Sequence, residues 1–244
     1  MNYDAIEEER KWYRRGRKAS KRRPLPERHH FAHSCVRSKL YSTLAGLGCR
    51  DTSSILEIGC GSGEELTFVS RASSNITAID VSQTALKGCR VKGVNGVLAD
   101  ARILPFRNGS FDYVLCSAVL HHLVGQGDLG DYLKEFARVT RQKGYVIALE
   151  PNLFNLSGIL MNIFNIIKPG ITGLVPHERA LSPFYLNNVF KSADLREITC
   201  VSASYTWNRF PLWISKLISR YEDRLRLKKP FSLFGWFVIV WGQK

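Results

Sequence analysis

The central part of the chain alternates short apolar runs with longer segments whose apolar residues recur at helical spacing. The apolar runs predict strands over residues 55–58, 76–80, 95–99, 111–117 and 144–149, and the longer segments predict helices over residues 63–71, 82–90 and 128–140. Strands that alternate with helices in this way form a parallel sheet with helices on both faces. The runs contain few polar residues, which is typical of strands buried on both faces.

The regular alternation ends after Pro151, and two inserted segments follow. Residues 152–181 predict an apolar helix, and residues 208–230 predict a basic amphipathic helix. The remaining predicted elements are a helix over residues 31–47, a helix that Ser182 caps and that runs to about Ala193, and strands over residues 196–207 and 231–241. These elements complete the predicted sheet and add helices that could cover a site.

The length and composition of the chain fit one globular domain. With 244 residues, of which 45% are hydrophobic and 23% are charged, the chain can bury a full core. We expect a basic arm over residues 1–30 and a single domain over residues 31–244, with its core in residues 53–150. The two inserted segments are predicted to act as lids over the site.

The cysteines and the apolar runs bear on the cellular compartment. The 6 cysteines include no C-x-x-C pair, which fits reduced thiols rather than a disulfide framework or a zinc site. Acidic residues near the N-terminus argue against a targeting sequence. No apolar run reaches the roughly 18 residues of a spanning helix. The sequence therefore predicts a cytoplasmic protein that is soluble or peripheral at a membrane surface.

The net charge of +14 is concentrated near the N-terminus. Residues 10–28 hold ten lysines and arginines, with Glu27 as the only acid among them. Such a segment could bind a nucleic-acid backbone, an anionic lipid surface or a phosphorylated substrate. It could equally be a solvated arm that keeps the protein soluble, because no recognition motif accompanies it.

Three glycines, Gly59, Gly61 and Gly63, stand at alternate positions directly after the first strand of the predicted core. Because glycine has no Cβ, a ligand can approach this backbone closely. Dinucleotide folds usually space their glycines G-x-G-x-x-G, so the third glycine comes one residue early here. Glu57 would repel a phosphate but could order the loop or reach a cationic ligand. Asp80, at the end of the next strand, can accept hydrogen bonds from both hydroxyls of a ribose.

Four motifs occur in order at compatible spacing. They are E-I-G-C-G-S-G at 57–63, Asp80 after its strand, A-D-A at 99–101, and L-P-F-R-N-G-S-F-D-Y-V at 104–114 followed by S-A-V-L-H-H-L at 117–123. With these motifs the chain resembles the class I S-adenosylmethionine-dependent methyltransferases of the small-molecule type over about residues 53–150. The resemblance implies a Rossmann-like three-layer sandwich. Its seven-stranded sheet would be mostly parallel with an antiparallel final strand, and helical insertions would follow the fifth and sixth strands.

The resemblance implies S-adenosyl-L-methionine as the cofactor. Asp100 would accept a hydrogen bond from the adenine N6 amine, while the Ala101 N–H would donate to N1. Ser117, at the end of the fourth strand, would lie near the sulfonium, and Cys60 is interpreted as a small space-filling residue. The predicted cofactor-binding residues are Glu57, Gly59, Cys60, Gly61, Gly63, Asp80, Val81, Asp100, Ala101 and Ser117.

Two adjacent histidines, His121 and His122, follow the fourth strand and are the candidate catalytic residues. Either could remove a proton from the acceptor as the methyl group transfers. The alternative is that they pack the start of a helix, since alignment and desolvation can suffice for methyl transfer. His177 and Glu178 are rival candidates, because they follow the apolar insertion. No metal site is predicted.

The segments outside the motifs carry what information there is on the acceptor. The acceptor hypothesis follows from a basic arm, an apolar helix and a basic amphipathic helix. They favour a small molecule with an apolar and an anionic part, such as a lipid-linked or phosphorylated saccharide. The same hypothesis includes contact of the protein with a membrane surface. One alternative is an RNA methyltransferase that uses the basic arm, although S-A-V-L stands where such enzymes carry an N/D-P-P-Y/F tetrapeptide. Another is a protein that binds the cofactor without catalysing transfer.

Overall fold

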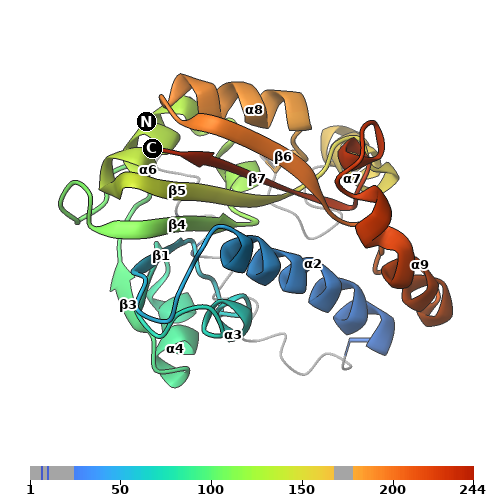
Figure 1. Ribbon diagram of the computed structural model, residues 1–244, viewed down its shortest axis with the longest axis horizontal. Helices are drawn as coiled ribbons and strands as arrows, with labels where there is room; N and C mark the ends of the chain where they lie inside the picture. Colours follow the sequence, from blue (N-terminus) through green and yellow to red (C-terminus); the bar gives the residue numbers. More distant parts are fainter. Residues whose placement is uncertain (1–6, 8–9, 11–24, 168–177) are drawn as a thin grey trace.

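A seven-stranded sheet in the order β3-β2-β1-β4-β5-β7-β6 forms the centre of the computed structural model, which describes residues 7, 10, 25–167 and 178–244 (Figure 1). The strands are β1 (Ile55–Ile58), β2 (Ile76–Asp80), β3 (Asn95–Leu98), β4 (Phe111–Ser117), β5 (Thr140–Pro151), β6 (Arg196–Ser204) and β7 (Phe237–Gln243). Strand β7 pairs antiparallel with both of its neighbours, and the other six run in one direction. This is the Rossmann-like arrangement that the motifs implied.

Helices cover both faces of the sheet and complete three layers (Figure 1). They are α2 (Glu27–Gly46), α3 (Leu66–Val69), α4 (Gln83–Val91), α5 (Leu120–Leu123), α6 (Leu129–Val139), α7 (Leu156–Ile167), α8 (Pro183–Ser192) and α9 (Leu212–Leu225), with the short 3₁₀ helix η1 at Phe231–Leu233. Helices α6 and α8 pack on one face, and α2, α3 and α4 pack on the other. The insertions that contain α7 and α9 follow β5 and β6, as predicted.

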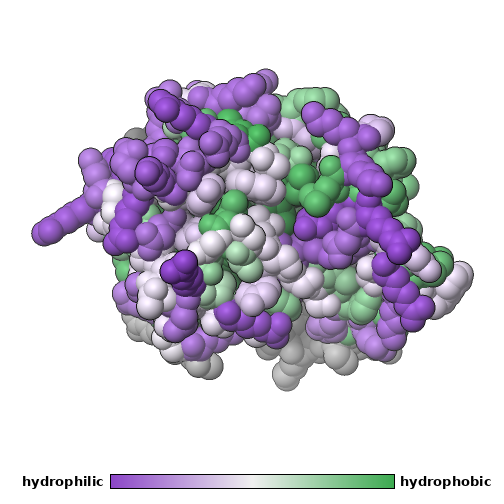
Figure 2. All heavy atoms as spheres, in the orientation of Figure 1, coloured by the Kyte–Doolittle hydropathy of each residue, from purple (hydrophilic) through white to green (hydrophobic). Residues whose placement is uncertain are grey.

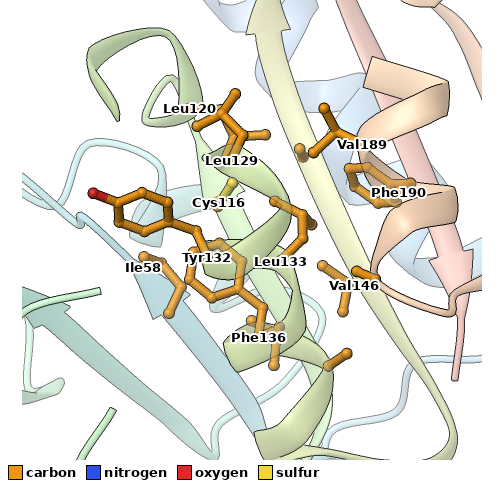
Figure 3. Close-up of a cluster of buried hydrophobic side chains, with 14 of the residues drawn as sticks. Ile58, Cys116, Leu120, Leu129, Tyr132, Leu133, Phe136, Val146, Val189 and Phe190 are labelled. Carbon is orange, nitrogen blue, oxygen red and sulfur yellow. The ribbon is translucent and has the colours of Figure 1, made fainter. Parts of the chain in front are cut away.

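Apolar side chains from both faces of the strands hold the layers together. On one face, Phe136 of α6 and Phe190 of α8 are fully buried against the sheet residues Ile58 and Val146 (Figure 3). On the other face, Ile55 of β1 packs with residues of α2 and α3. Full burial of each such side chain stabilises the fold by about 1.5–3 kcal/mol. The central strands β1, β2 and β4 are therefore mostly apolar and buried, because each of their faces meets a helical layer.

Several predicted boundaries were wrong. The strand predicted at 144–149 runs from Thr140 to Pro151, and the one predicted at 196–207 ends at Ser204. Three others were wrong for a local reason. Helix α2 begins at Glu27 rather than residue 31, directly after the extended Pro26, so the end of the predicted arm belongs to this helix. Gly63 has a φ of +73°, which no right-handed helix contains, so the helix predicted from residue 63 begins only at Leu66. The last strand begins at Phe237 rather than residue 231, because a 3₁₀ turn precedes it.

The order of the strands places the candidate site. Strand β1 pairs with β2 on one side and with β4 on the other, so Ile58 lies beside both Ile79 and Cys116. The loops that follow these three parallel strands therefore meet at one edge of the sheet, where the direction of winding reverses. Ligands of open α/β sheets bind at this switch point. Within the described residues, no helix is both long enough and apolar enough to cross a bilayer.

Candidate functional site

The glycine-rich loop after β1 has a backbone conformation that favours glycine at three positions. Gly59, Gly61 and Gly63 all have positive φ, between +50° and +73°. A Cβ added to Gly59 would lie 2.6 Å from Cγ2 of Val119, so no larger residue fits without displacing the loop after β4. The two loops thus approach each other closely at the sheet edge, as a cradle for a bound ligand requires.

Asp80, at the end of β2, fixes this loop from the side. Its Oδ2 accepts a hydrogen bond from the Gly61 N–H at 2.9 Å, and its Oδ1 accepts one from the Ser82 N–H at 2.7 Å. A carboxylate has about four lone-pair sites, so it can accept from ligand hydroxyls while it holds the loop. The side chain is 5% exposed, which strengthens each of these bonds.

Glu57 is a buried carboxyl group beneath the glycine loop. The residue is 1% exposed, and among the described residues its Oε2 has no hydrogen-bond partner. Burial, reinforced by the nearby Glu65, raises the pKa of Glu57 well above its usual value. Burial therefore favours the neutral form of this carboxyl group, unless a cationic group lies close enough to stabilise the charge.

Cys60 lies within the loop, but its side chain points away from the ligand side. Its Sγ lies 3.0 Å from Sγ of Cys89 on α4, and both residues are buried. Its backbone N–H donates to the Ile79 carbonyl at 3.0 Å. Cys60 therefore packs the loop onto α4, in line with a space-filling role, and could touch a ligand only through other backbone atoms.

A pocket of about 230 Å³ lies beside the end of β2. It is lined by Arg10, Val81, Ser82, Gln83, Thr84 and Leu98. The Nε of Arg10 donates to the Val81 carbonyl at 3.1 Å, so this residue of the basic arm forms part of the pocket wall. The other basic residues of the arm between residues 11 and 24 lie outside the described residues.

Asp100 and Ala101 follow β3 at the same edge of the sheet. Asp100 accepts hydrogen bonds from the backbone N–H of Arg102 at 2.9 Å and from Nε of the same residue. Burial alone would raise the pKa of Asp100, but the bonds from Arg102 outweigh it and lower that pKa. Asp100 is therefore a charged acceptor that a ligand amine could share with Arg102, and Ala101 is almost buried beside it.

His121 is held by a carboxylate that the sequence analysis did not single out. Its Nδ1 lies 2.7 Å from Oε2 of Glu150, which is fully buried at the end of β5. Oε1 of Glu150 also accepts from the N–H groups of Val119 at 3.0 Å and Leu120 at 2.8 Å. With Nδ1–H donated to this carboxylate, Nε2 of His121 carries the lone pair and can accept a proton.

His122 forms a second pair with a glutamate from the apolar insertion. Its Nδ1 lies 3.1 Å from Oε1 of Glu178, whose side chain is only 4% exposed, and its ring lies 4.1 Å from the ring of His121. His121, His122 and Glu178 each offer a ligand atom, and these atoms lie within 4.8 Å of one another. This group could therefore hold a metal ion, although the sequence predicted none. His177, the other rival candidate, lies outside the described residues.

The segment that carries Glu178 connects this cluster to α7. The Arg179 N–H donates to the His121 carbonyl at 3.2 Å, and the Ala180 N–H donates to Oδ1 of Asn162 on α7 at 2.7 Å. The apolar helix is thus anchored beside the histidines. Ser117, at the end of β4, is nearly buried just before them.

Two residues of the site had escaped the sequence analysis. Glu150 directly follows the strand predicted over residues 144–149, and its only signal was a charge next to an apolar run. Arg10 was indistinguishable from the other cations of its segment. Neither spacing nor residue type could have paired Glu150 with His121, because the pairing depends on β4 and β5 lying side by side.

Comparison with known proteins agrees with this geometry. The family model described as a methyltransferase domain matches residues 56–148. Residues 56–148 form a methyltransferase domain, of the class I S-adenosylmethionine-dependent type. The match covers the glycine loop, Asp80, Asp100 and the histidine pair.

The proteins to which this chain is similar are named for different acceptors. The chain is 35% identical over 93 residues to a tRNA (carboxymethyluridine(34)-5-O)-methyltransferase of Arabidopsis thaliana, covering 38% of this chain and 22% of that protein. It is 31% identical over 115 residues to a fatty-acid O-methyltransferase of Mycolicibacterium smegmatis, covering 45% and 41%. The chain thus spans less than half the length of either relative.

A solved structure resembles nearly the whole chain. It is a methyltransferase of Thermotoga maritima, described as a possible histamine N-methyltransferase, with a TM-score of 0.68 at 18% identity over 89% of this chain and 91% of that one. At this identity the likeness shows the fold alone. The residues at this edge of the sheet fit S-adenosylmethionine, because Asp80 and Asp100 are acceptors that the ribose hydroxyls and the adenine amine could share.

Proposed function

We propose that the protein transfers a methyl group from S-adenosylmethionine to a small-molecule acceptor, with His121 as the proton acceptor. The bond between His121 Nδ1 and the buried Glu150 is the observation that carries this proposal. A carboxylate that holds one imidazole nitrogen fixes the tautomer and the ring orientation, and it stabilises the imidazolium once the other nitrogen has taken a proton.

The chain supplies positioning, desolvation and proton transfer. The cofactor, when bound, supplies a methyl group that is already activated on a sulfonium. Gly59 and Gly61 shape the loop that receives the cofactor, and Asp80 accepts from the ribose hydroxyls. His121 takes the proton of the acceptor as its nucleophilic atom is methylated, and Glu178 holds His122 beside it.

The acceptor is proposed to be a lipid-type or saccharide-type small molecule with an apolar part. Its support is the apolar helix α7, which the Glu178 segment ties to the histidines. Six side chains of α7 are large, apolar and exposed: Leu156, Ile159, Ile163, Phe164, Ile166 and Ile167. A relative named for fatty-acid methylation agrees with an apolar acceptor, whereas the relative named for tRNA favours RNA.

Release of S-adenosylhomocysteine in the presence of a panel of acceptors tests the proposal. The panel contains fatty acids, polyprenyl phosphates, lipid-linked saccharides and tRNA, and mass spectrometry identifies the product. We expect turnover with an acceptor that has an apolar part. Turnover with tRNA alone would establish the RNA alternative, and binding of the cofactor without turnover on any acceptor would establish a non-catalytic role.

The variant His121→Asn tests the role of the histidine. It should lower kcat by about 10²- to 10⁴-fold, the usual contribution of a general base. Calorimetry with S-adenosylhomocysteine should give an unchanged affinity, because the cofactor loop is intact. His30→Asn, at an exposed position on α2, is the matched control. An unchanged kcat in His121→Asn would show that the histidine only packs the helix start.

A further inference from the structure

Large apolar side chains that are exposed concentrate in the segment from residue 156 to residue 234. Besides the six on α7, they are Phe184, Tyr185, Trp213, Leu217, Tyr221, Leu225, Leu227, Phe231 and Phe234. Isolated exposed apolar residues are normal, but a concentration of this size marks an interaction surface. Figure 2 shows hydrophobic surface toward the end of the molecule where α7 and α9 lie, with strongly hydrophilic side chains beside it.

Helix α9 presents its apolar stripe outward. Trp213, Leu217, Tyr221 and Leu225 follow one another at intervals of four residues, and their exposed fractions are 68%, 50%, 53% and 40%. Residues four apart lie on one face of a helix. An ordinary surface helix turns such a stripe toward the core. This one turns it toward solvent.

The buried side of α9 is polar instead. Glu222 is 2% exposed, and its Oε2 accepts hydrogen bonds from Ser204 Oγ at 2.8 Å and from the Tyr205 N–H at 2.9 Å. On the same helix, Lys39 of α2 reaches Asp223 at 2.6 Å. These bonds fix the rotation of α9, so the outward direction of the apolar stripe is built into the fold.

The apolar surface continues from α9 to the start of α7. Asn155 donates from Nδ2 to the Phe234 carbonyl at 3.3 Å, and the rings of Phe154 and Phe234 lie 6.4 Å apart. Phe231 and Phe234, both about half exposed, therefore connect the end of α9 to the first turn of α7. We call this continuous surface, formed by α7, η1 and α9, the apolar face.

Basic side chains border the apolar face. Lys216, Arg220 and Arg224 are exposed on α9 beside the stripe, and Lys228 and Lys229 follow the helix. Apolar and aromatic residues beside a row of lysines and arginines are typical of helices that lie in the interface of an anionic bilayer. Each cation near such a surface contributes further attraction. The positive net charge of the chain has the matching sign.

We propose that the apolar face docks on the surface of an anionic phospholipid bilayer, with α9 lying in the interface. This inference deepens the proposed function, because the face includes α7, which is anchored beside His121 and His122. A docked protein could receive an acceptor directly from the lipid phase. Docking also explains why the chain keeps Trp213 exposed, since tryptophan favours the level of the headgroups.

Co-sedimentation of the full chain with vesicles tests docking without any turnover. The probes are vesicles of phosphatidylcholine with and without phosphatidylserine, at low and high salt. We expect binding to the phosphatidylserine vesicles that weakens with salt. Trp213→Glu should reduce the bound fraction at least about 10-fold, because a charge replaces an interfacial anchor. Ile103→Glu, which changes a side chain that is 79% exposed on another part of the surface, should bind as the unaltered chain does.

The other outcomes overturn the proposal. Equal binding by Trp213→Glu and Ile103→Glu would assign vesicle binding to the basic arm instead. A dimer that Trp213→Glu dissociates would make the face a contact between two copies. Failure of docking is distinguishable from failure of the proposed function, since release of S-adenosylhomocysteine from acceptors in detergent solution needs no bilayer.

Discussion

Glu150 and His121 are 29 residues apart in the chain, and the carboxylate near the end of β5 lies 2.7 Å from the imidazole on α5, the helix that follows the neighbouring strand β4. The same carboxylate accepts the N–H groups of Val119 and Leu120. One buried group therefore caps the start of α5 and orients the candidate base.

Glu150→Gln should lower the free energy of unfolding by about 1–3 kcal/mol, the cost of leaving a buried group without its partner. The amide keeps the volume of the carboxyl group, but it offers only one oxygen for the donors that now share two. Urea unfolding measures the change. Asp131→Asn, where the side chain is 72% exposed, is the control and should change stability by less than about 0.5 kcal/mol. Equal effects of the two variants would argue against a capping role for Glu150.

Gly59→Ala should weaken cofactor binding as well as stability. The φ of +64° strains any residue with a Cβ, and the added methyl group would meet Val119 at 2.6 Å. We expect affinity for S-adenosylhomocysteine to fall at least about 10-fold and stability to fall by about 1–3 kcal/mol. Calorimetry and urea unfolding give the two values. Gly46→Ala, at the end of α2, is the control: a Cβ added there meets no atom of another part of the chain within 4 Å. This variant should leave the affinity unchanged.

Asp80→Asn should disorder the cofactor loop. The carboxylate accepts from both the Gly61 and the Ser82 N–H groups, whereas an amide would turn a donor toward one of them. Affinity for S-adenosylhomocysteine should fall by at least about 10-fold, since charge-assisted bonds are roughly twice as strong as neutral ones. Asp51→Asn, at an exposed position, serves as the control in the same calorimetric titration. A twofold change or less in Asp80→Asn would remove the ribose contact from the proposal.

The buried Glu57 predicts a dependence of stability on pH. Its pKa is raised well above 4.5 in the folded protein, chiefly by burial, so the folded state keeps a proton that the unfolded state loses. Stability should therefore fall as pH rises above about 4.5, until the folded group also loses its proton.

Glu57→Gln removes this group, so the variant should lose stability less steeply between pH 5 and pH 8 and should be the more stable protein at the upper end. Urea unfolding across this range gives the two slopes. Glu64→Gln, where the side chain is 63% exposed, should keep the slope of the unaltered chain. If the free energy of unfolding depended on pH in the same way in all three proteins, Glu57 would be charged in the folded state.

The cluster of His121, His122 and Glu178 makes a prediction about metal ions. Because the proposed transfer uses His121 as a proton acceptor, dialysis against EDTA should leave the rate of S-adenosylhomocysteine release unchanged. Added Zn²⁺ should inhibit, since imidazole and carboxylate groups within 4.8 Å of one another can bind it. Loss of activity on chelation that a divalent ion restores would instead make the cluster a metal centre.

Local patterns predicted much of the fold because they depend on few neighbours. The bounds of β1, β2 and β4 match the apolar runs at 55–58, 76–80 and 111–117, since strands buried on both faces are mostly apolar. The start of the last strand could not be predicted in this way. Phe231 and Phe234 are apolar, but Phe231 begins the 3₁₀ helix η1 and Phe234 directly follows it. Both side chains remain exposed.

The sequence by itself determined which residues gather at one edge of the sheet. Glu57 and Asp80 lie near the ends of strands, the glycine loop and Asp100 follow strands, and parallel strands bring such ends together. Only the tertiary structure paired His121 with Glu150 and His122 with Glu178, and only it rotated the apolar stripe of α9 toward solvent. These arrangements depend on which strands are neighbours and on contacts such as that of Glu222 with Ser204, which no local pattern encodes.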